Sequence, residues 1–304
     1  MRLAITHDTR YRYRPAVQTA QHVAHLQAAN TPCQTVIGHA MQVEPVATVQ
    51  HNIDAFLNHR AYWALTHPHD GLWVRAYSEL ETRATPEATS AQSWESVREH
   101  FRYRAGQAGD VHSRFVFGSH HAPVHEAFLA YAQSSFTPGR PLVQAAQELP
   151  ARMHRALRYE TASTDINTPA LEALAQQRGV CQDFAHILVA CLRSLGLPAR
   201  YVSGYLLTQP PPGKPRLIGS DASHAWASVY LLDAKGQGLG WYDLDPTNNR
   251  CGLGTPGEDY VTLALGRDYA DISPMRGVIQ GGNSHQLKVA VTVMPPSQDE
   301  AAAQ

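Results

Sequence analysis

The sequence contains no run of 18 or more apolar residues, so we expect no helix that crosses a membrane. Its first ten residues, MRLAITHDTR, lack the basic and then apolar layout of a secretory signal, which favours a cytoplasmic location. The 25 basic and 26 acidic side chains give a formal net charge of -1. Composition therefore gives no electrostatic reason to expect nucleic acid or an anionic membrane as a partner.

Cysteine is also scarce, and the four residues Cys33, Cys181, Cys191 and Cys251 show no CxxC spacing. These features argue against a disulfide framework and against a zinc knuckle. The 17 histidines raise the question of a metal, and HPHD at 67–70 and HHAPVHE at 120–126 are the tightest groups. Neither spacing places two imidazoles on one helical face with a third ligand, so we expect no metal and no cofactor.

The first third of the chain has the pattern of β-structure. In LAITHDTRYRY (3–13), apolar and aromatic side chains alternate with polar ones, which predicts a half-buried strand. QTVIGHAMQVEP (34–45) and GLWVRAYSELET (71–82) follow this pattern less clearly. The polar stretch ATPEATSAQS (84–93) has no period and reads as a linker between domains.

Helical periodicity follows the linker, first around 94–101 and 124–131, and then over 141–160, where Pro150 predicts a kink or a split. The strongest amphipathic helix begins at Cys181 and ends before Gly196 and Pro198. Short strands are predicted at 199–207, 224–232, 240–245 and 285–295, with a Pro/Gly loop at 209–221 and a frayed tail at 297–304. We therefore predict a β-rich domain (1–88), a second domain (89–275), and a last strand and tail (276–304) that pack on the first domain.

Cys181 is the first residue of its predicted helix. The first turn of a helix carries unpaired N–H groups and the positive end of the helix dipole. A thiolate there is stabilised relative to the thiol, and the Cys181 N–H can donate to an oxyanion. Because Cys181 shares a helical face with Phe184 and Leu188, we expect its sulfur to point toward the sheet that follows. The position favours a cysteine nucleophile.

A nucleophilic cysteine needs a base, and the base needs a group that orients it. His224 lies on one predicted strand, and Asp243 and Asp245 end the next. If these strands are antiparallel neighbours, His224 and one aspartate lie about 5 Å apart at Cβ. The two aspartates have the same strand parity, so spacing leaves the choice open, although Pro246 indicates that the strand ends at Asp245.

Four motifs occur in the order GVCQDFAH, LGLPARYVSGY, SHAW and GWYDLDPTN. Together they resemble the core of the transglutaminase-like superfamily, and HDTRYRY and GRDYADISPMRGVIQGG resemble its bacterial subgroup with a β-rich N-terminal domain. The resemblance implies an α+β fold, in which a helix carrying Cys181 packs on an antiparallel sheet in a papain-like core. Position by position, it implies Cys181 as nucleophile, His224 as base and Asp245 as the group that orients the base.

The implied activity is thiol-dependent acyl transfer on peptide or glutamine carboxamide bonds of a peptide or protein substrate, through a thioester. We favour a cysteine protease or amidohydrolase, because bacterial members are commonly grouped with proposed cysteine proteases. An amine-accepting transglutaminase and a non-catalytic binding module that retains the fold are the alternatives. Gln182 and Asp183 stand where calcium-dependent animal enzymes have an aromatic residue, and the sequence has no Asp-rich loop with calcium spacing, so calcium is not implied.

The residues around the expected site have simpler explanations. We expect Cys33 and Cys191 to be small buried hydrophobes and Asp183 to be a partner of the helix dipole. His186 is expected to be a packed or capping histidine, and Trp226 a strand aromatic that shares the face of His224. For a second oxyanion donor, the sequence leaves Tyr159, Tyr205 and Trp226 open.

Overall fold

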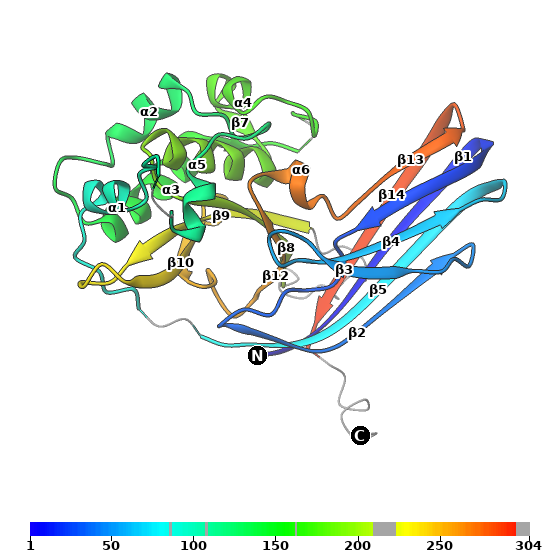
Figure 1. Ribbon diagram of the computed structural model, residues 1–304. Helices are drawn as coiled ribbons and strands as arrows, with labels where there is room; N and C mark the ends of the chain where they lie inside the picture. Colours follow the sequence, from blue (N-terminus) through cyan, green and yellow to red (C-terminus); the bar gives the residue numbers. More distant parts are fainter. Residues whose placement is uncertain (85–86, 107–108, 162, 209–222, 296–304) are drawn as a thin grey trace, which may run out of the picture.

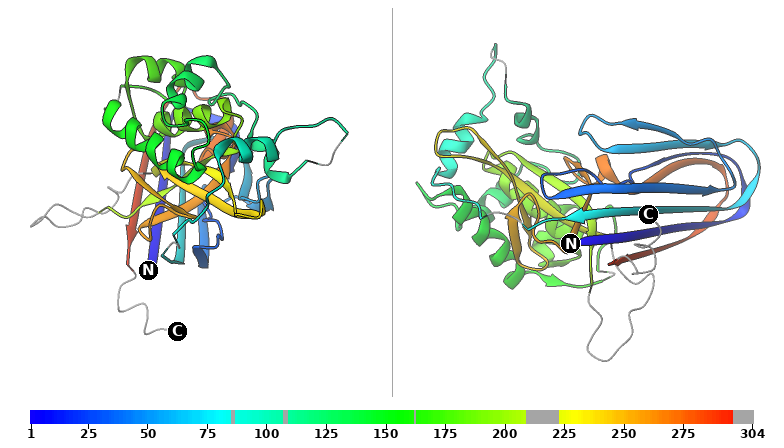
Figure 2. Two further views of the ribbon diagram at one scale, coloured as in Figure 1. Left: turned by 90° about the vertical axis from the view of Figure 1, so that its left-hand side faces the viewer. Right: turned by 90° about the horizontal axis from the view of Figure 1, so that it is seen from below.

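The structure is a computed structural model that describes residues 1–84, 87–106, 109–161, 163–208 and 223–295. In this part of the chain, two β-sheets pack together, and helices cover the far side of the second sheet (Figure 1). The right-hand view of Figure 2 shows that the helices and the long strands of the first sheet lie at opposite ends of the molecule. The predicted α+β fold is confirmed. The loop predicted at 209–221 and the tail predicted at 297–304 lie outside the described residues.

The strands of the first sheet are β1 (Arg2–Ala24), β2 (Gln34–Glu44), β3 (Gln50–Ile53), β4 (His59–Leu65), β5 (His69–Thr82), β13 (Met275–Gly281) and β14 (Ser284–Met294). The second sheet contains β8 (Ala199–Leu206), β9 (Ser223–Leu232), β10 (Gly238–Asp245), β11 (Arg250–Leu253) and β12 (Tyr260–Gly266), and β6 (Arg158–Tyr159) pairs with β7 (Arg178–Gly179). The helices are α1 (Trp94–His100), the 3-10 helix η1 (Val111–Phe115), α2 (Glu126–Gln133), α3 (Leu142–Ala156), α4 (Ala170–Gln176), α5 (Cys181–Ser194) and α6 (Tyr269–Ile272).

Strand β1 organises the first sheet. Its first half pairs with β5 on one side and β14 on the other, and its second half pairs with β4 and β13. The predicted alternation is confirmed, because Leu3, Ile5 and Tyr13 are buried while Arg10 and Arg12 are exposed. The last two strands of the chain thus return to the sheet that the first strand begins. The domain boundaries at residues 88 and 275 stay predictions.

Helix α5 is the centre of the second unit and packs against β8 and β9. It begins at Cys181 and ends where the sequence predicts. Gly196 has a φ of 81°, a left-handed conformation that suits glycine after a helix. Its N–H donates to the Arg193 carbonyl (2.8 Å), and the Leu197 N–H donates to the Leu192 carbonyl (3.0 Å). These two bonds satisfy the last carbonyls of the helix in a Schellman motif.

Of the two alternatives predicted at Pro150, the split is wrong and the kink stays a prediction. Helix α3 runs without a break through Pro150, which is buried. Its neighbours Leu149 and Met153 are also fully buried, in the same core as α5. Burial of this apolar face stabilises the helix enough to offset the hydrogen bond that proline cannot donate.

The two sheets meet over an apolar interface with matched hydrogen bonds. Leu3, Val291 and Val293 of the first sheet pack with Tyr205 and Val261 of the second. Two amide side chains also reach across: Gln34 exchanges two hydrogen bonds with the backbone of Thr262, and Asn58 does the same with Leu265, each bond 2.8 Å long. Because each amide imitates a strand neighbour, these pairs set how the two sheets sit against each other.

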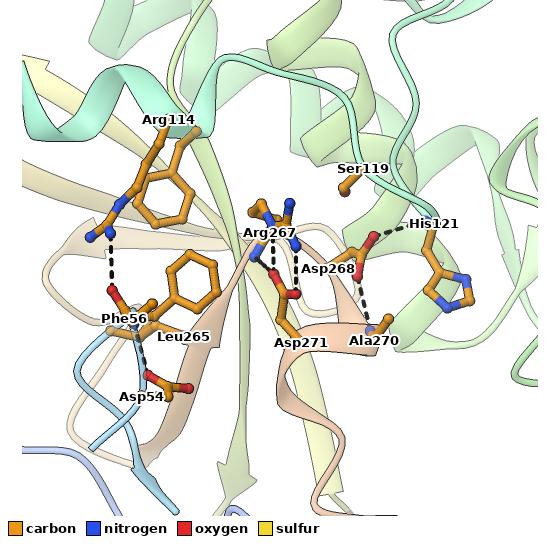
Figure 3. Close-up of polar contacts among 12 residues, drawn as sticks. Asp54, Phe56, Arg114, Ser119, His121, Leu265, Arg267, Asp268, Ala270 and Asp271 are labelled. Atoms are coloured by element: carbon orange, nitrogen blue, oxygen red, sulfur yellow. Dashed lines mark hydrogen bonds and ion pairs between the residues drawn. The ribbon is translucent and has the colours of Figure 1, made fainter. Parts of the chain in front are cut away.

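Figure 3 shows the polar contacts around one end of this interface. Arg114 of η1 donates to the carbonyl of Ala55 (2.9 Å), in the turn between β3 and β4. The carboxylate of Asp268 caps α6 by accepting from the Ala270 N–H (2.9 Å), and it also accepts from the His121 N–H (2.8 Å). The two Asp268 bonds tie the start of α6 to the segment before α2. No helix in the described ranges is long and apolar enough to cross a membrane, and the cytoplasmic location stays a prediction.

Gly204 of β8 provides a test of the packing. It lies opposite His224 in the register of β8 and β9, and a Cβ there would collide with the Val261 carbonyl and the Trp226 ring. We expect Gly204→Ala to lower the free energy of unfolding by about 1–3 kcal/mol, as overpacking does. Gly38→Ala in β2 is the matched control, because nothing lies within 4 Å of a Cβ there. Urea denaturation of both variants measures the difference, and equal stabilities would contradict the packing described.

Candidate active site

The start of α5 is held by a capping carboxylate, which positions Cys181. The Asp183 side chain accepts from the Val180 N–H (2.8 Å) and from the Thr164 hydroxyl (2.6 Å). Gly179 packs directly on it, since a Cβ there would lie 2.7 Å from the Asp183 carboxylate. Asp183 is therefore a helix cap, in keeping with its expected role at the helix dipole.

His224 lies near the start of β9, and its imidazole has a partner on each side. Its Nε2–H donates to Oδ2 of Asp245, the last residue of β10, over 2.7 Å. The Cys181 thiol is close enough to the same ring to raise the pKa of His224 through its hydrogen bond and charge. Because Nε2 is engaged by Asp245, Nδ1 is the ring nitrogen that remains available to the sulfur. The three residues selected from the sequence thus meet in space.

Asp245 is fully buried, yet its carboxylate is well supplied with donors. Oδ2 accepts from the Tyr260 hydroxyl (2.6 Å) and the Asn248 amide (2.8 Å) as well as from His224, and Oδ1 accepts from the Thr247 N–H (2.8 Å). Burial alone would raise the pKa of Asp245, but the bond and charge of His224, with the Tyr260 and Asn248 bonds, lower it below its ordinary value. The carboxylate is therefore ionised at neutral pH.

The two neighbours of the His224 imidazole, Asp245 and Cys181, determine its protonation. Burial disfavours the imidazolium, but the hydrogen bonds and charges of Asp245 and Cys181 outweigh it and raise the pKa of His224 to about 10. The ring centroids of Trp226 and Tyr260 each lie 5.9 Å from that of the imidazole. An imidazolium held between a carboxylate and a sulfur can stabilise a thiolate and later release its proton.

The choice between the two aspartates, which spacing leaves open, is decided by the register of β9 and β10. Asp243 pairs with Ser228, and its carboxylate accepts from the Ser228 hydroxyl and from the Trp226 indole N–H (3.2 Å). It is buried away from His224. Asp245 lies two residues further on, at the strand end, where the chain turns back toward the histidine.

Three supporting residues were not identified from the sequence. Asn248 follows in the motif DPTNN, where the bonds from Thr247 and Asn248 N–H groups to Asp245 form a turn that an Asp-Pro pair makes recognisable. Thr164 and Tyr260 carry no comparable signal, because they are 19 and 15 residues from the aspartates they contact, and only the packing brings them to the site.

The remaining candidates have other partners. The Trp226 indole N–H donates a hydrogen bond to Asp243, and the Tyr205 hydroxyl is hydrogen-bonded to Nδ1 of His7 (2.8 Å). Of the three oxyanion candidates, Tyr159 is the one whose hydroxyl pKa is raised by the charge of Cys181 in addition to burial. His186 is buried and accepts from the Tyr269 N–H (3.2 Å), so it is a packed histidine as expected.

Cys33 and Cys191 are buried free thiols, and Cys251 is a partly buried one. Burial raises the pKa of each, to about 12 for Cys251, which makes them poor nucleophiles. Among the described residues, no group of three or more His, Cys, Asp or Glu side chains could hold a metal ion.

A cavity of about 290 Å³ gives access to the sulfur. The second sheet and α5 form one side, with Cys181, Gln182 and His224. The first sheet forms the other, with side chains of β1 and β14. The site is therefore a cleft between the two sheets.

Comparison with known families identifies both parts of the chain. Residues 129–246 match the transglutaminase-like superfamily, and residues 3–81 match the bacterial transglutaminase-like N-terminal region. The chain belongs to the transglutaminase-like superfamily. The resemblance seen in the motifs is thus confirmed for both parts of the chain.

Several relatives match this chain over nearly its full length. The uncharacterised protein Rv2569c of Mycobacterium tuberculosis is 36% identical over 97% of this chain and 93% of its own. ML0607 of Mycobacterium leprae, also uncharacterised, is 29% identical over 96% of this chain and 98% of its own. The crystal structure of a proposed cysteine protease from Cytophaga hutchinsonii has a TM-score of 0.73 and 18% identity, covering 98% of this chain and 92% of that one. That structure has the same fold.

The contact between His224 and Asp245 predicts the titration of the histidine. In an NMR titration, His224 should stay protonated up to a pH of about 10. In Asp245→Asn, its pKa should fall toward the ordinary value of 6.5, because a neutral amide stabilises the imidazolium less. Since the folded pKa is the higher one, the stability that this pair contributes is fully present below pH 6.5 and is lost as pH rises through about 10.

Asp243→Asn is the matched control for this titration, because Asp243 contacts Ser228 and Trp226 and not His224. It should leave the pKa of His224 near that of the unmodified protein. A His224 pKa that Asp245→Asn does not change would contradict the assignment of the pair.

Proposed function

We propose that this protein is a thiol-dependent acyl-transfer enzyme that hydrolyses peptide or glutamine carboxamide bonds. Cys181 is the nucleophile, His224 the general acid and base, and Asp245 the residue that orients and charges the histidine. The observation that carries the proposal is the His224 imidazole, held between the Cys181 sulfur and the Asp245 carboxylate. The superfamily and the fold of the proposed protease from Cytophaga hutchinsonii support the same class of chemistry.

In the first half of the reaction, the Cys181 thiolate attacks the carbonyl carbon of the substrate. The carbonyl oxygen becomes an oxyanion, and the Cys181 N–H in the first turn of α5 donates to it. The carbon–nitrogen bond then breaks, and the imidazolium of His224 gives its proton to the leaving amine or ammonia. The acyl group remains on the sulfur as a thioester.

In the second half, a water molecule attacks the thioester while the neutral imidazole accepts its proton. The carbon–sulfur bond breaks, the acid is released and the thiolate is restored beside an imidazolium. Asp245 keeps the ring in one orientation throughout, since its bonds to Tyr260 and Asn248 fix the carboxylate. If an amine replaces water, the same residues perform a transglutaminase reaction.

The reactivity of Cys181 tests the nucleophile. Iodoacetamide at pH 6 should label Cys181 before Cys33, Cys191 and Cys251, because the imidazolium stabilises its thiolate while burial suppresses the other thiols. Peptide mapping by mass spectrometry measures the order of labelling. In His224→Gln, the labelling of Cys181 at pH 6 should become slower, because the imidazolium is gone, while the labelling of the other three cysteines should not change. Labelling of Cys181 no faster than the buried cysteines would favour a non-catalytic module.

Product analysis separates the reaction types. With glutamine-containing peptides and a labelled amine, backbone cleavage identifies a peptidase, ammonia without amine incorporation a deamidase, and incorporation a transferase. Cys181→Ala should abolish every product and the thioester on residue 181. His224→Gln and Asp245→Asn should each lower kcat by about 10²–10⁴-fold. Turnover that survives in Cys181→Ala would exclude the mechanism.

A further inference from the structure

The wall that the first sheet contributes to the catalytic cavity is built from one face of β1 and β14. These strands pair in antiparallel register, with Val289 opposite Thr9 and Leu287 opposite Tyr11. Side chains directly opposite each other point to the same face of a sheet. His7, Thr9, Tyr11, Leu287 and Val289 all line the cavity that contains Cys181.

The apolar row on β14 continues beyond the contact between the sheets. Val291 and Val293 are buried against the second sheet, but Val289 and Leu287, further along the same face, are 46% and 52% exposed. Large aliphatic side chains gain free energy when a partner removes them from water. Here the uncovered part of the row lies where it faces the nucleophile.

The described part of the wall that β1 and β14 form is also uncharged, in contrast to His224 on the other side of the cavity. The described lining residues include no Asp, Glu, Lys or Arg. Alternation places the charged residues Asp8, Arg10 and Lys288 of these strands on the opposite face. His7 bonds the Tyr205 hydroxyl (2.8 Å) and the Thr9 hydroxyl (3.1 Å), and burial lowers its pKa to about 4, so it is neutral at pH 7.

We propose that Tyr11, Leu287 and Val289 form a substrate subsite that binds an apolar side chain of an extended peptide, next to the carbonyl that Cys181 attacks. This rests on the proposed function and names its substrate class. An apolar side chain covers the exposed aliphatic row, whereas a charged one would lose water against the described residues of β1 and β14, which offer no counter-charge there. The first sheet is therefore part of the active site and selects the substrate.

The two sheets that form the cavity walls are fixed relative to each other, which a selective subsite requires. Gln34 and Asn58 each bridge the sheets with paired 2.8 Å bonds. Helix α6 and the residues after it complete the cavity with Tyr269, Pro274 and Met275. The Asp268 cap and the Arg267–Asp271 ion pair (2.9 Å) keep this segment in place (Figure 3).

Acetyl-dipeptide chloromethyl ketones with Leu, Glu or Lys beside the reactive carbonyl test the subsite. Their rates of Cys181 modification are divided by the iodoacetamide rate, which cancels differences in thiol reactivity. The Leu probe should react about ten-fold or more faster than the Glu and Lys probes, the ratio expected for covering one aliphatic side chain. Leu287→Lys should raise the relative rate of the Glu probe and lower that of the Leu probe.

Val278→Lys on β13 is the matched control, because Val278 is 78% exposed and does not line the cavity. It should leave the three relative rates unchanged. Equal rates for the three probes, or a Leu287→Lys protein with the original preference, would overturn the subsite while the iodoacetamide reaction still supported the proposed function.

Peptide binding to Cys181→Ala tests the subsite without any reaction at the sulfur. Fluorescein-labelled peptides that differ only by Leu or Glu should bind this variant unequally, with the Leu peptide tighter, and Leu287→Lys should reverse the order. This preference would support the subsite even if Cys181 proved unreactive and the proposed function failed. Equal binding of both peptides would count against the subsite.

Discussion

The buried pair of Asp245 and His224 is the interaction on which the site depends. A carboxylate without contact with water is stable as an anion only when donors surround it, and Asp245 has the imidazole, a phenol, an amide and a backbone N–H. Removal of one partner from a buried ion pair costs about 3–5 kcal/mol, because the other charge is left uncompensated. The set is therefore also a strong constraint on how β9, β10 and β12 are arranged.

A second carboxylate, Asp183, independently positions the nucleophile by capping its helix. Asp183 fixes the first turn of α5 and so the position of the Cys181 sulfur, while Asp245 fixes the ring that faces it. Two buried carboxylates on different elements thus determine the distance between thiol and imidazole. Neither has to touch a substrate in order to matter for reactivity.

The packing of the two sheets explains why the N-terminal region belongs to the site. An apolar face that begins as the contact between the sheets continues along β14 into the cavity beside Cys181. The same alternation that buries Val291 and Val293 therefore presents Val289 and Leu287 to a substrate. One strand pattern serves both stability and the shape of the cleft.

Local pattern accounts for much of this protein. The alternation in β1, the helix that begins at Cys181 and the stop at Gly196 follow from side-chain periodicity and backbone preference, which act over a few residues. The split, one of the two alternatives expected at Pro150, was wrong because local preference was outweighed by burial in the core. Cys181, His224 and Asp245 could be chosen from the motifs because each lies at the start or end of a predictable element.

Tertiary structure alone decided the rest. Strand parity cannot separate Asp243 from Asp245, and only the register of β9 and β10 turns one toward Ser228 and the other toward His224. Tyr260, Thr164 and the wall formed by Leu287 and Val289 come from segments far apart in the chain, and no local signal links them to Cys181. The sequence by itself determined which elements form and where the reactive groups sit on them. Which side chains meet was decided by long-range packing, because pairing across distant strands depends on the whole core and not on any one stretch of residues.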